Sequence, residues 1–401
     1  MISTNKALSI IKNNTNAISD EKVKVESAIG RTLTVNVKST MASPPFAMSA
    51  MDGYAIKLNK ITKILEPFQV VKEVFAGQNN DIKIKNQQAI RIFTGGKIPI
   101  GANIVIIQEN VKVLKNHKIM INQANFKNIF IRKKGQDYKI GTNLIKKGKK
   151  LNSRDIGLLL SSGINEVKVF RNPNVVVIAT GNELLKPIKK IKNSKIYASS
   201  LYMLKNLLYL SGANCIELKI IKDNEKLLKE YINSLKKTDI IITTGGVSVG
   251  KKDLVKKVLN DLGMKKKFWK VLIKPGKPIL YGKIKHVHIF GLPGNPVSTY
   301  VCYLLFVLET ISRMKGQKNN FLTKEKALLQ EDIENNSARE SYYRGKYVKL
   351  NNTVTVKIIK NQDSSLLNNL STANCLIKIP SNLNKIKKGT SVDIIILENG
   401  F

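Results

Sequence analysis

Cysteine and histidine are scarce in this chain. Its 401 residues include three of each, namely Cys215, Cys302, Cys375, His117, His286 and His288, with no Cys-x-x-Cys pair. This spacing excludes a thiolate metal site and a disulfide framework, and it leaves little room for histidine-based catalysis. His286 and His288 would share one face of a strand, where they could chelate a metal. A solvated pair on an edge strand is the commoner arrangement, and we predict that arrangement.

Long apolar runs are also missing. The first residues, MISTNKALSIIKNNTN, contain no apolar stretch of the signal-peptide type. The most apolar segment, 299-TYVCYLLFVLETI-311, is shorter than the roughly 20 residues that a membrane helix needs. We therefore predict a buried helix at this position, no membrane association, and a cytoplasmic protein.

Acidic residues are few. The chain contains 28 Asp and Glu residues and 68 Lys and Arg residues, which gives a net charge of +40. Such a surplus suggests nucleic acid as a partner. However, the basic residues are spread over every quarter of the chain, with no arm or tail, and Lys, Ile and Asn share A/T-rich codons. Genome composition is therefore sufficient to explain the charge, and we expect no specific nucleic-acid partner. The charge would still draw small anions into any cleft.

Hydrophobic residues make up 43% of the chain, enough for the two to four domains that its length suggests. A helix over 5–18 and another over 153–161 flank a series of short strands, which indicates a β unit. The predicted strands of this unit are 32–37, 68–74, 89–95, 104–109 and 128–133. After residue 320 strand patterns return, at 342–350, 353–359, 375–379 and 391–397.

Between these β regions, apolar strands alternate with helices. The run 175-VVVIAT-180 is typical of a parallel strand that is buried on both faces. The other predicted strands are 215–221, 239–244, 268–273 and 287–292, and the helices are 199–212, 225–236, 252–261 and 297–314. This alternation predicts βαβ units on a parallel sheet. The fold class is therefore multidomain α/β plus β.

Two glycine-rich turns follow strands of the α/β unit, namely 243-TTGGVSVGKKD-253 and 291-GLPGNPVS-298. Ligands of open α/β sheets bind at the carboxyl ends of the strands, where glycines let the backbone approach an anion. Each turn alone is equally well explained as a tight connection, but the pair favours a phosphate-bearing ligand. The candidate ligand-binding residues are Gly245, Gly246, Ser248, Gly250, Pro293, Gly294, Asn295 and Ser298.

A rigid cationic corner, 274-KPGKP-278, lies between the two glycine turns. Lys274 and Lys277 could meet an oxyanion as point charges, although a solvated lysine loop is the alternative. A third turn, 179-ATGNELL-185, offers Thr180, together with Glu183 as an oxygen ligand for a hard metal.

Carboxylates are placed on further turns. Asp52 lies in 49-SAMDGYA-55 and Asp137 in 132-RKKGQDY-138, while Asp223 follows the strand 215–221. Thr94 lies in 92-IFTGGKIP-99. Each Asp alone is more often a turn residue than a catalyst. Together they could form an oxygen-ligand Mg²⁺ site, but the sequence does not show that they meet in space.

In combination these motifs resemble one family. SAMDGYA, TGG-x-IP, R-x-x-GQD, TGNEL, TTGGVSVG-x-x-D, KPGKP and GLPGNPVS occur in the order found in molybdopterin molybdenumtransferases, the MoeA and gephyrin E-domain family. The similarity runs from about residue 5 to the C-terminus. The motifs of the α/β unit alone would also fit the adenylyltransferases of the same pathway, but SAMDGYA and the β-rich tail separate the two groups.

The resemblance implies four domains. These are a discontinuous helical and linker domain (1–43 and 140–172), an inserted β domain (44–139), a molybdopterin-binding α/β domain (173–318) and a C-terminal β-barrel-like domain (319–401). It also implies a homodimer in which the active cleft lies between the α/β domain of one subunit and the β domain of the other. Asp52, Thr94 and Asp137 would then face the partner's glycine turns.

The reaction implied by the resemblance is the insertion of molybdate into adenylylated molybdopterin, with release of AMP and a requirement for Mg²⁺. By motif, the candidates for the metal and nucleotide site are Asp52, Asp137, Glu183, Asp223 and Asp253. Of these, Glu183, Asp52 and Asp223 are the expected metal ligands, and Asp52, Asp137 and Asp223 the expected catalytic residues. The candidates for the molybdate end are Lys274, Lys277, Ser298, Arg344 and Ser364.

The chain departs from the family pattern in three motifs. The family often has acids where this chain has Asn182, Gln136 and Ala198, and an Asn where it has Ser200. Two carboxylates thus become amides and one is lost, which bears on metal affinity. The alternatives to the transferase are a molybdopterin adenylyltransferase and a catalytically weak molybdopterin-binding scaffold.

Overall fold

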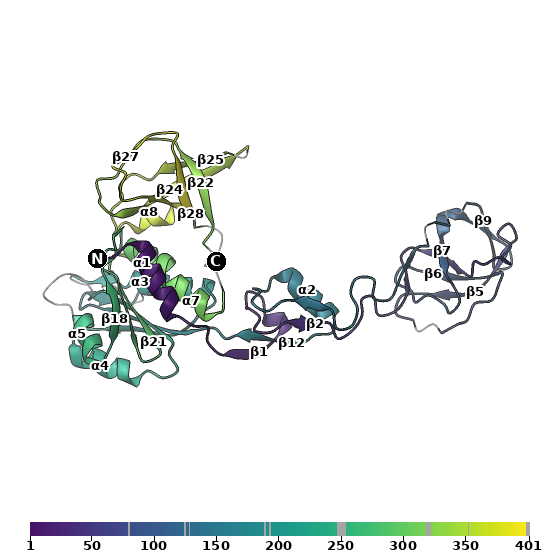
Figure 1. The fold of residues 1–401 in the computed structure, drawn as a ribbon, viewed down its shortest axis with the longest axis horizontal. Helices are drawn as coiled ribbons and strands as arrows, with labels where there is room; N and C mark the ends of the chain where they lie inside the picture. Colours follow the sequence, from purple (N-terminus) through teal and green to yellow (C-terminus); the bar gives the residue numbers. More distant parts are fainter. Residues whose placement is uncertain are drawn as a thin grey trace.

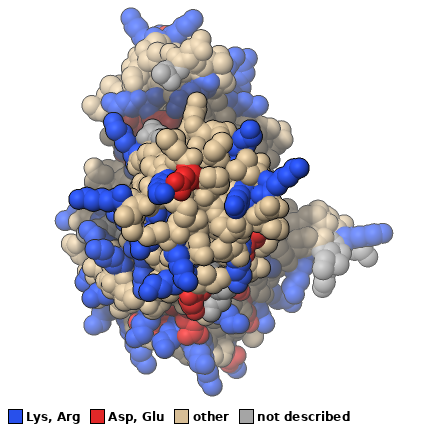
Figure 2. Space-filling view, turned by 90° about the vertical axis from the view of Figure 1, so that its right-hand side faces the viewer, with Lys and Arg blue, Asp and Glu red and all other residues tan. Residues whose placement is uncertain are grey.

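The computed structural model describes residues 1–78, 81–123, 126–127, 129–187, 190–191, 194–246, 254–317, 322–351 and 353–397. Figure 1 shows an elongated molecule. An α/β domain with a β-barrel stacked on it forms one end, a small linker domain lies in the middle, and a β domain forms the far end. In Figure 2, Lys and Arg side chains are scattered over the visible face and do not gather into one stripe.

The α/β domain is built on a six-stranded sheet. Its order is β16 (Asn214–Ile221), β13 (Asn174–Thr180), β17 (Ile240–Thr244), β21 (Val287–Leu292), β20 (Leu280–Ile284) and β18 (Lys265–Trp269). The first four strands run parallel to one another, β20 runs antiparallel to β21, and β18 runs antiparallel to β20. Val175 and Val177 enter the core on one face of β13, whereas Val176 and Ile178 enter the core on the other. The predicted parallel-rich sheet, buried on both faces, is confirmed.

Helices cover both faces of this sheet. One face packs α3 (Ser199–Leu210) and the continuous helix formed by α6 (Pro296–Cys302), the π-turn η3 (Tyr303–Val307) and α7 (Leu308–Met314). The other face packs α4 (Glu225–Ser234) and α5 (Leu254–Asp261). The helix Pro296–Met314 is long and apolar enough to cross a bilayer, but 89% of its most apolar window is buried inside the protein. The prediction of a buried helix here is confirmed.

The first helix, α1 (Thr4–Asn14), packs on the α/β domain. Its buried Ala7 and Ile11 belong to the core that α3 and the helix Pro296–Met314 also line. The preceding residue Ile2 forms a β-bridge with Val271. The sequence prediction groups residues 1–43 with the linker domain, whereas the buried face of α1 packs on the α/β domain. Amphipathic spacing identifies a buried face but not the domain against which it is buried.

The predicted strand 268–273 is two strands in the structure. β18 ends at Trp269, and β19 (Ile273–Lys274) pairs with a strand of the C-terminal barrel. Lys270 between them adopts a φ of +65°, which no extended strand contains. The chain therefore leaves one sheet and enters the other within four residues.

The expectation of a solvated edge-strand pair at His286 and His288 is wrong for His288. β21 lies between β17 and β20, so it is an interior strand, and His288 is 2% exposed. Its Nδ1 lies 3.0 Å from the hydroxyl of Tyr281. His286 is exposed at the turn before the strand. The two side chains therefore do not form a chelating pair.

Burial, with a smaller contribution from the charge of Lys283, lowers the pKa of His288 from 6.5 to about 3. The unfolded chain takes up this proton below about pH 6.5, whereas the folded protein does not do so until about pH 3. As the pH is lowered from about 6.5 to about 3, we therefore expect the free energy of unfolding to decrease. The contribution from this residue is at most about 1.4 kcal/mol per pH unit. Urea unfolding of wild type and His288→Gln across this range tests the expectation. Equal pH slopes for the two proteins would contradict it.

The C-terminal domain is a closed barrel of five strands. They are β24 (Glu340–Leu350), β25 (Thr353–Ile358), β22 (Lys324–Leu329), β28 (Ser391–Ile396) and β26 (Cys375–Ile379), and β24 also pairs with β26. A small ladder of β23 (Ile333–Glu334) and β27 (Lys385–Ile386) and the short helix α8 (Leu367–Ser371) complete the domain. The predicted barrel-like domain is confirmed. Strand β19, which follows β18 of the α/β domain, pairs with β24 of the barrel.

A small linker domain joins the two ends of the molecule. It contains β1 (Asp20–Lys24) paired with β12 (Glu166–Phe170), β2 (Val37–Lys38) paired with β11 (Asn143–Ile145), the 3₁₀ turn η1 (Val25–Ser27) and α2 (Ser153–Ser161). Both Arg171 terminal nitrogens bind the Asp239 carboxylate at 2.7 Å. Asp239 is almost fully buried beside β17, so this bidentate pair fixes the linker to the α/β domain.

The β domain is a six-stranded sheet. Its order is β7 (Ile104–Ile107), β4 (Gly53–Ile56), β6 (Gln88–Ile92), β5 (Phe68–Val74), β9 (Lys118–Ile121) and β8 (Val111–Leu114). The short strands β3 (Met48–Ser49) and β10 (Ile131–Arg132) pair beside it, and η2 (Gln108–Asn110) follows β7. Apolar side chains on both faces form two small cores. The fold of this domain therefore depends on close strand contacts over its whole width.

Gly53 illustrates how tight these contacts are. A Cβ atom on Gly53 would lie 2.1 Å from the carbonyl oxygen of Ile106 in β7. We expect Gly53→Ala to destabilise the β domain by about 3 kcal/mol, because backbone atoms must shift. Gly157→Ala in helix α2 is the matched control, since nothing lies within 4 Å of the added Cβ. There the helix should gain roughly 0.5–1 kcal/mol. The measurement is urea unfolding, monitored by proteolysis of the β domain. The expectation would be contradicted if both variants unfolded at the same urea concentration as wild type.

Candidate functional site

A cavity of about 640 Å³ lies where the α/β domain meets the barrel. Its α/β wall consists of residues that the sequence identified: Gly245, Gly246, Lys274, Lys277, Pro293, Gly294, Asn295 and Ser298. Ser364 of the barrel also lines it. The structure therefore places both glycine turns and the lysine corner around one space. It lies at the carboxyl ends of β17 and β21, the edge where open α/β sheets bind ligands.

The glycine turn after β17 requires glycine for steric reasons. Gly245 and Gly246 have φ values of +84° and +64°. A Cβ on Gly245 would lie 2.7 Å from the carbonyl oxygen of Thr180, and one on Gly246 would lie 2.5 Å from Val255. Larger residues would push this turn away from β13 and α5. The turn can thus present its backbone to a ligand.

The lysine corner is fixed by two domains. In the ladder between β19 and β24, Ile273 lies opposite Glu340, and Lys274 opposite Ser341. Gly276, at a φ of +109°, packs against Cys302 of α6, where a Cβ would lie 2.6 Å from the sulfur. Both lysine side chains are half-buried, and within the described residues neither ammonium forms an ion pair. Two positive charges therefore line the cavity.

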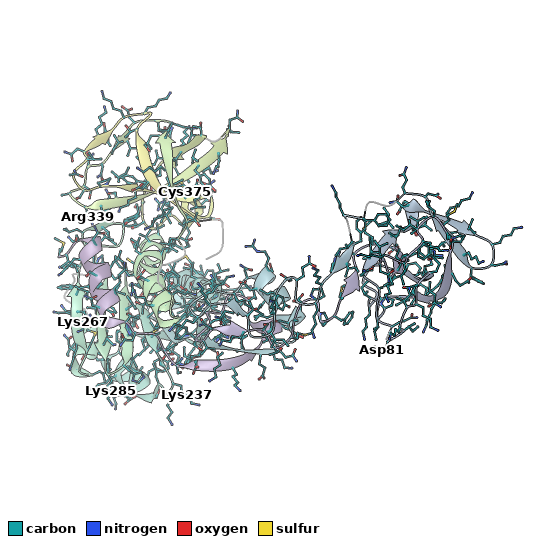
Figure 3. The ribbon with its side chains drawn as sticks, turned by 45° about the vertical axis from the view of Figure 1, so that its right-hand side comes forward. Asp81, Lys237, Lys267, Lys285, Arg339 and Cys375 are labelled. Atoms are coloured by element: carbon teal, nitrogen blue, oxygen red, sulfur yellow. The ribbon has the colours of Figure 1, made fainter. Side chains whose placement is uncertain are left out.

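The barrel contributes residues that the sequence analysis did not identify, namely Arg339, Tyr342, Tyr343, Gln362 and Asp363. The Arg339 guanidinium donates to the carbonyl oxygen of Ile273 at 3.3 Å, directly before Lys274. Figure 3 shows Arg339 at the junction between the barrel and the α/β domain. A third cation therefore lies on the cavity wall. Only the pairing of β19 with β24 brings it there, and no local sequence signal reports that pairing.

Arg344, predicted at the molybdate end, does not line the cavity. It is 1% exposed, and its terminal nitrogens donate to the carbonyl oxygens of Asp363 (3.0 Å) and Asn361 (3.2 Å). Its backbone N–H donates to Gln362. Arg344 therefore holds the loop that carries Ser364 and reaches the cavity only through that loop. The Ser364 hydroxyl in turn accepts a hydrogen bond from Asn295 at 2.8 Å, which joins the loop to the start of α6.

A second cavity, of about 430 Å³, adjoins the first and shares Gly245, Gly294 and Asn295 with it. Thr180 and Glu183 line it, as do residues of α3 and of the short ladder between β14 (Leu184–Leu185) and β15 (Ile196–Tyr197). Asp223 lies nearby, because its carboxylate accepts from the backbone N–H of Asn182 at 3.3 Å. Asp223, at the end of β16, is thus bonded to the turn after β13 that also carries the exposed Glu183.

The remaining predicted residues belong to the β domain. Asp52 accepts hydrogen bonds from the Thr94 N–H (2.7 Å) and hydroxyl (2.8 Å). These bonds, and to a lesser degree the charge of Arg91, hold the pKa of Asp52 below its usual value. Asp137 is exposed, and its N–H donates to Ser43. β3 pairs with β10 and also bonds to Gly95 and Gly96, so the motifs that carry these residues converge on one edge of the domain.

Within one chain the two groups of residues lie at opposite ends (Figure 1). Asp52 is therefore remote from Glu183 and Asp223, with which it was predicted to bind a metal. Within the described ranges no three His, Cys, Asp or Glu residues lie close enough to share a metal ion. Ser248, Gly250 and Asp253 lie outside the described residues. Within one chain the predicted ligands therefore do not come together in the described residues.

Comparisons with known proteins match this arrangement along nearly the whole chain. The MoeA N-terminal region (domains I and II) matches residues 2–163, the molybdopterin binding domain 176–313, and the MoeA C-terminal region (domain IV) 326–397. Molybdopterin molybdenumtransferase of Haemophilus influenzae is 33% identical over 381 residues, covering 93% of each chain. That of a Nostoc species is 32% identical, covering 94% of this chain and 88% of the relative.

Solved structures agree. The molybdopterin biosynthesis MoeA protein from Pyrococcus horikoshii superposes with a TM-score of 0.81 at 29% identity, covering 99% of this chain and all of that one. The four-part architecture, the cavity between the α/β domain and the barrel, and these similarities lead to one conclusion. The chain belongs to the molybdopterin molybdenumtransferase family, the transferases of molybdenum cofactor biosynthesis.

Proposed function

We propose that this protein inserts molybdate into adenylylated molybdopterin and releases AMP. The observation that carries the proposal is the cavity between the α/β domain and the barrel, which combines a glycine turn with three cationic side chains. In the reaction the two dithiolene sulfurs of the substrate replace oxygens of molybdate, and the phosphoanhydride to the adenylyl group is hydrolysed. Because the substrate supplies the sulfur ligands, the enzyme needs no cysteine cluster.

Lys274, Lys277 and Arg339 would hold the molybdate oxyanion. All three line the cavity, and the two lysines have no carboxylate partner within the described residues. Charge-assisted contacts to an oxyanion are the strong class of hydrogen bond, and an arginine fork adds direction to the point charges of lysine. Ser364 and Ser298 add hydroxyls on the same wall.

We further propose a homodimer with a shared site. The separation of the two residue groups within one chain supports this arrangement, because the β domain that carries Asp52, Thr94 and Asp137 lies at the opposite end of the chain from the cavity (Figure 1). A twofold axis would then make two equivalent sites, each with residues from both subunits. We expect the dimer to act in the cytoplasm.

The carboxylates fit Mg²⁺. Glu183 and Asp223 offer exposed oxygens at adjoining strand ends, and oxygen ligands are those that this hard cation prefers. Asp52 of a partner subunit would add a third carboxylate. When bound, Mg²⁺ supplies charge stabilisation to the phosphoanhydride as it is cleaved. Glu183 and Asp223 would orient the adenylyl end, while the glycine turn holds the phosphates through backbone N–H groups.

The three departures from the family pattern favour a second candidate, a molybdopterin-binding scaffold with weak activity. Where the family often has acids, the side-chain oxygen of Asn182 accepts from the backbone N–H of Asp223, and that of Gln136 accepts from the N–H of Lys133. These side chains are thus occupied in local turns and add no negative charge. A metal bound here would have fewer carboxylates around it.

The purified protein tests the proposal directly. With adenylylated molybdopterin, we expect AMP release that requires both molybdate and Mg²⁺. Substrate binding without AMP release would identify the scaffold. Consumption of ATP with molybdopterin, in place of AMP release, would identify the adenylyltransferase.

A further inference from the structure

We propose that the outer edge of strand β18 docks an acidic, extended segment of a partner protein, which adds a strand to the sheet of the α/β domain. The docking surface consists of the lysines at 265–267, Trp269, Lys270 and Lys256 of α5. None of these residues lines either cavity, so the inference goes beyond the proposed function and does not rest on it. In Figure 3, Lys267 lies on the side of the α/β domain that is remote from the β domain.

The first observation is a free strand edge. β18 is the last strand of its sheet, and in the part of the chain that the structure describes it pairs only with β20. An unpaired edge is a template for a further strand. The chain directly after β18 already accepts extended backbone. There the Ile2 N–H donates to the carbonyl oxygen of Lys270 at 3.2 Å, and the Leu272 N–H donates to that of Ile2 at 2.9 Å.

The second observation is a bulge that exposes three consecutive lysines. The register of β18 against β20 shifts between Lys266 and Phe268. Neighbouring residues of a regular strand point to opposite faces, but a bulge interrupts this alternation. Lys265, Lys266 and Lys267 are all exposed, whereas Phe268 is buried in the core. The edge therefore presents a row of positive charges.

These charges are not neutralised by the chain itself. Among the described residues, no carboxylate forms an ion pair with the lysines at 265–267, and the nearby Lys257 pairs with Glu225 at 2.7 Å instead. The opposite edge of the sheet differs, because β16 exposes both Glu217 and Lys219. Charge of a single sign is therefore a feature of the β18 edge and not of both edges of this sheet.

Trp269 holds two further ammonium groups at the end of β18. The Nζ atom of Lys256 lies 3.7 Å from the centre of the indole ring, and that of Lys270 lies 4.0 Å from it. The ring attracts each cation, but two positive charges beside one ring also repel one another. A carboxylate that docks beside them would relieve this repulsion. Because ammonium groups already lie over the ring, Trp269 is not a free platform on which a nucleic-acid base would stack.

An acidic strand fits this surface better than a second copy of the same edge does. Two β18 edges would bring lysines opposite lysines, and like charges destabilise a strand pair. Opposite charges across a strand pair stabilise it, so a segment with Glu or Asp at alternate positions complements the lysine row. Main-chain hydrogen bonds along the free edge would add affinity.

Trp269 is the one tryptophan of the chain, so its emission reports on this surface alone. The test is titration of the full-length protein, at low ionic strength, with a short peptide of alternating Glu and Val. We expect a saturable change in tryptophan emission. The combined variant Lys265→Gln, Lys266→Gln and Lys267→Gln should bind the peptide about tenfold more weakly. The same peptide with every backbone nitrogen methylated keeps its charge but loses its main-chain donors, and it should also bind more weakly.

The matched control carries Lys229→Gln, Lys236→Gln and Lys237→Gln, which remove three exposed lysines of the same domain and lower the net charge equally. Figure 3 shows Lys237 well separated from Lys267. The control should bind the peptide as wild type does. Melting temperatures verify that both triple variants are folded, and both should behave as wild type does in the AMP-release assay, because neither set of lysines lines a cavity.

The proposal would be refuted if the emission of wild type did not respond to the peptide, or if the two triple variants bound it equally. Equal binding of the methylated peptide would overturn strand addition. A single-stranded oligonucleotide that bound these lysines more tightly than the peptide does would assign the surface to nucleic acid and overturn the acidic partner.

Discussion

Asp52→Asn is expected to lower the rate of AMP release by a factor on the order of 10²–10³ while leaving the fold intact. The Asp52 carboxylate accepts two hydrogen bonds from Thr94, which favour its charged form. Asparagine keeps the shape and one acceptor oxygen but removes the negative charge. Because the residue is at the surface of its own chain, little packing changes. A large loss of rate would therefore support the proposed role of Asp52 in a site shared between two subunits.

Asp81→Asn is the matched control for Asp52→Asn. Asp81 is an exposed carboxylate of the same β domain, paired with Lys97 at 2.7 Å, and Figure 3 shows it at the far end from Arg339. A surface pair of this kind contributes little to stability, so its loss should change the rate less than about twofold. The account of Asp52 would be wrong if the two variants were equally active.

Lys277→Gln should lower kcat/KM for molybdate by a factor on the order of 10². The ammonium lies on the cavity wall, within a corner held by β19 and by the packing of Gly276 on α6. Glutamine keeps a polar side chain of similar reach but removes the charge that meets the oxyanion. Steady-state rates at varied molybdate concentration provide the measurement.

Lys285→Gln is the control for Lys277→Gln. Lys285 is an exposed lysine at the turn between β20 and β21, and its loss lowers the net charge of the protein by the same amount. If both variants lost activity to the same degree, a general electrostatic attraction of molybdate would explain the effect better than a contact at Lys277.

The sequence predicted those elements whose pattern is strong and local. Helix α2 over 153–161, strand β21 over 287–292 and strand β26 over 375–379 have the predicted bounds. In each, apolar spacing and flanking turn residues agree with the final packing. The glycine turns were identifiable for the same reason, since a turn after a buried strand is determined by residues that are adjacent in the sequence.

What the sequence did not predict depends on contacts between distant segments. The split of 268–273 follows from the pairing of β19 with β24, about 70 residues later in the chain. Arg339 reaches the cavity through that pairing, and Arg344 is buried beneath the loop it supports. His288 was misplaced because a strand's position within a sheet, interior or edge, is not encoded in its own residues. The spacing of apolar residues predicts which face of a helix or strand is buried, but it does not identify the segment that packs against that face.

The central claim is that the site is made between two copies of this chain, and mixing two inactive variants tests it most directly. Asp52→Asn and Lys277→Gln subunits are unfolded together, refolded as a mixture, and assayed for AMP release. In each mixed dimer one site would receive intact Asp52 and Lys277 from opposite subunits, and the other site would lack both. Random assembly should therefore restore about a quarter of wild-type activity. Activity no higher than that of the two variants assayed separately would contradict the claim.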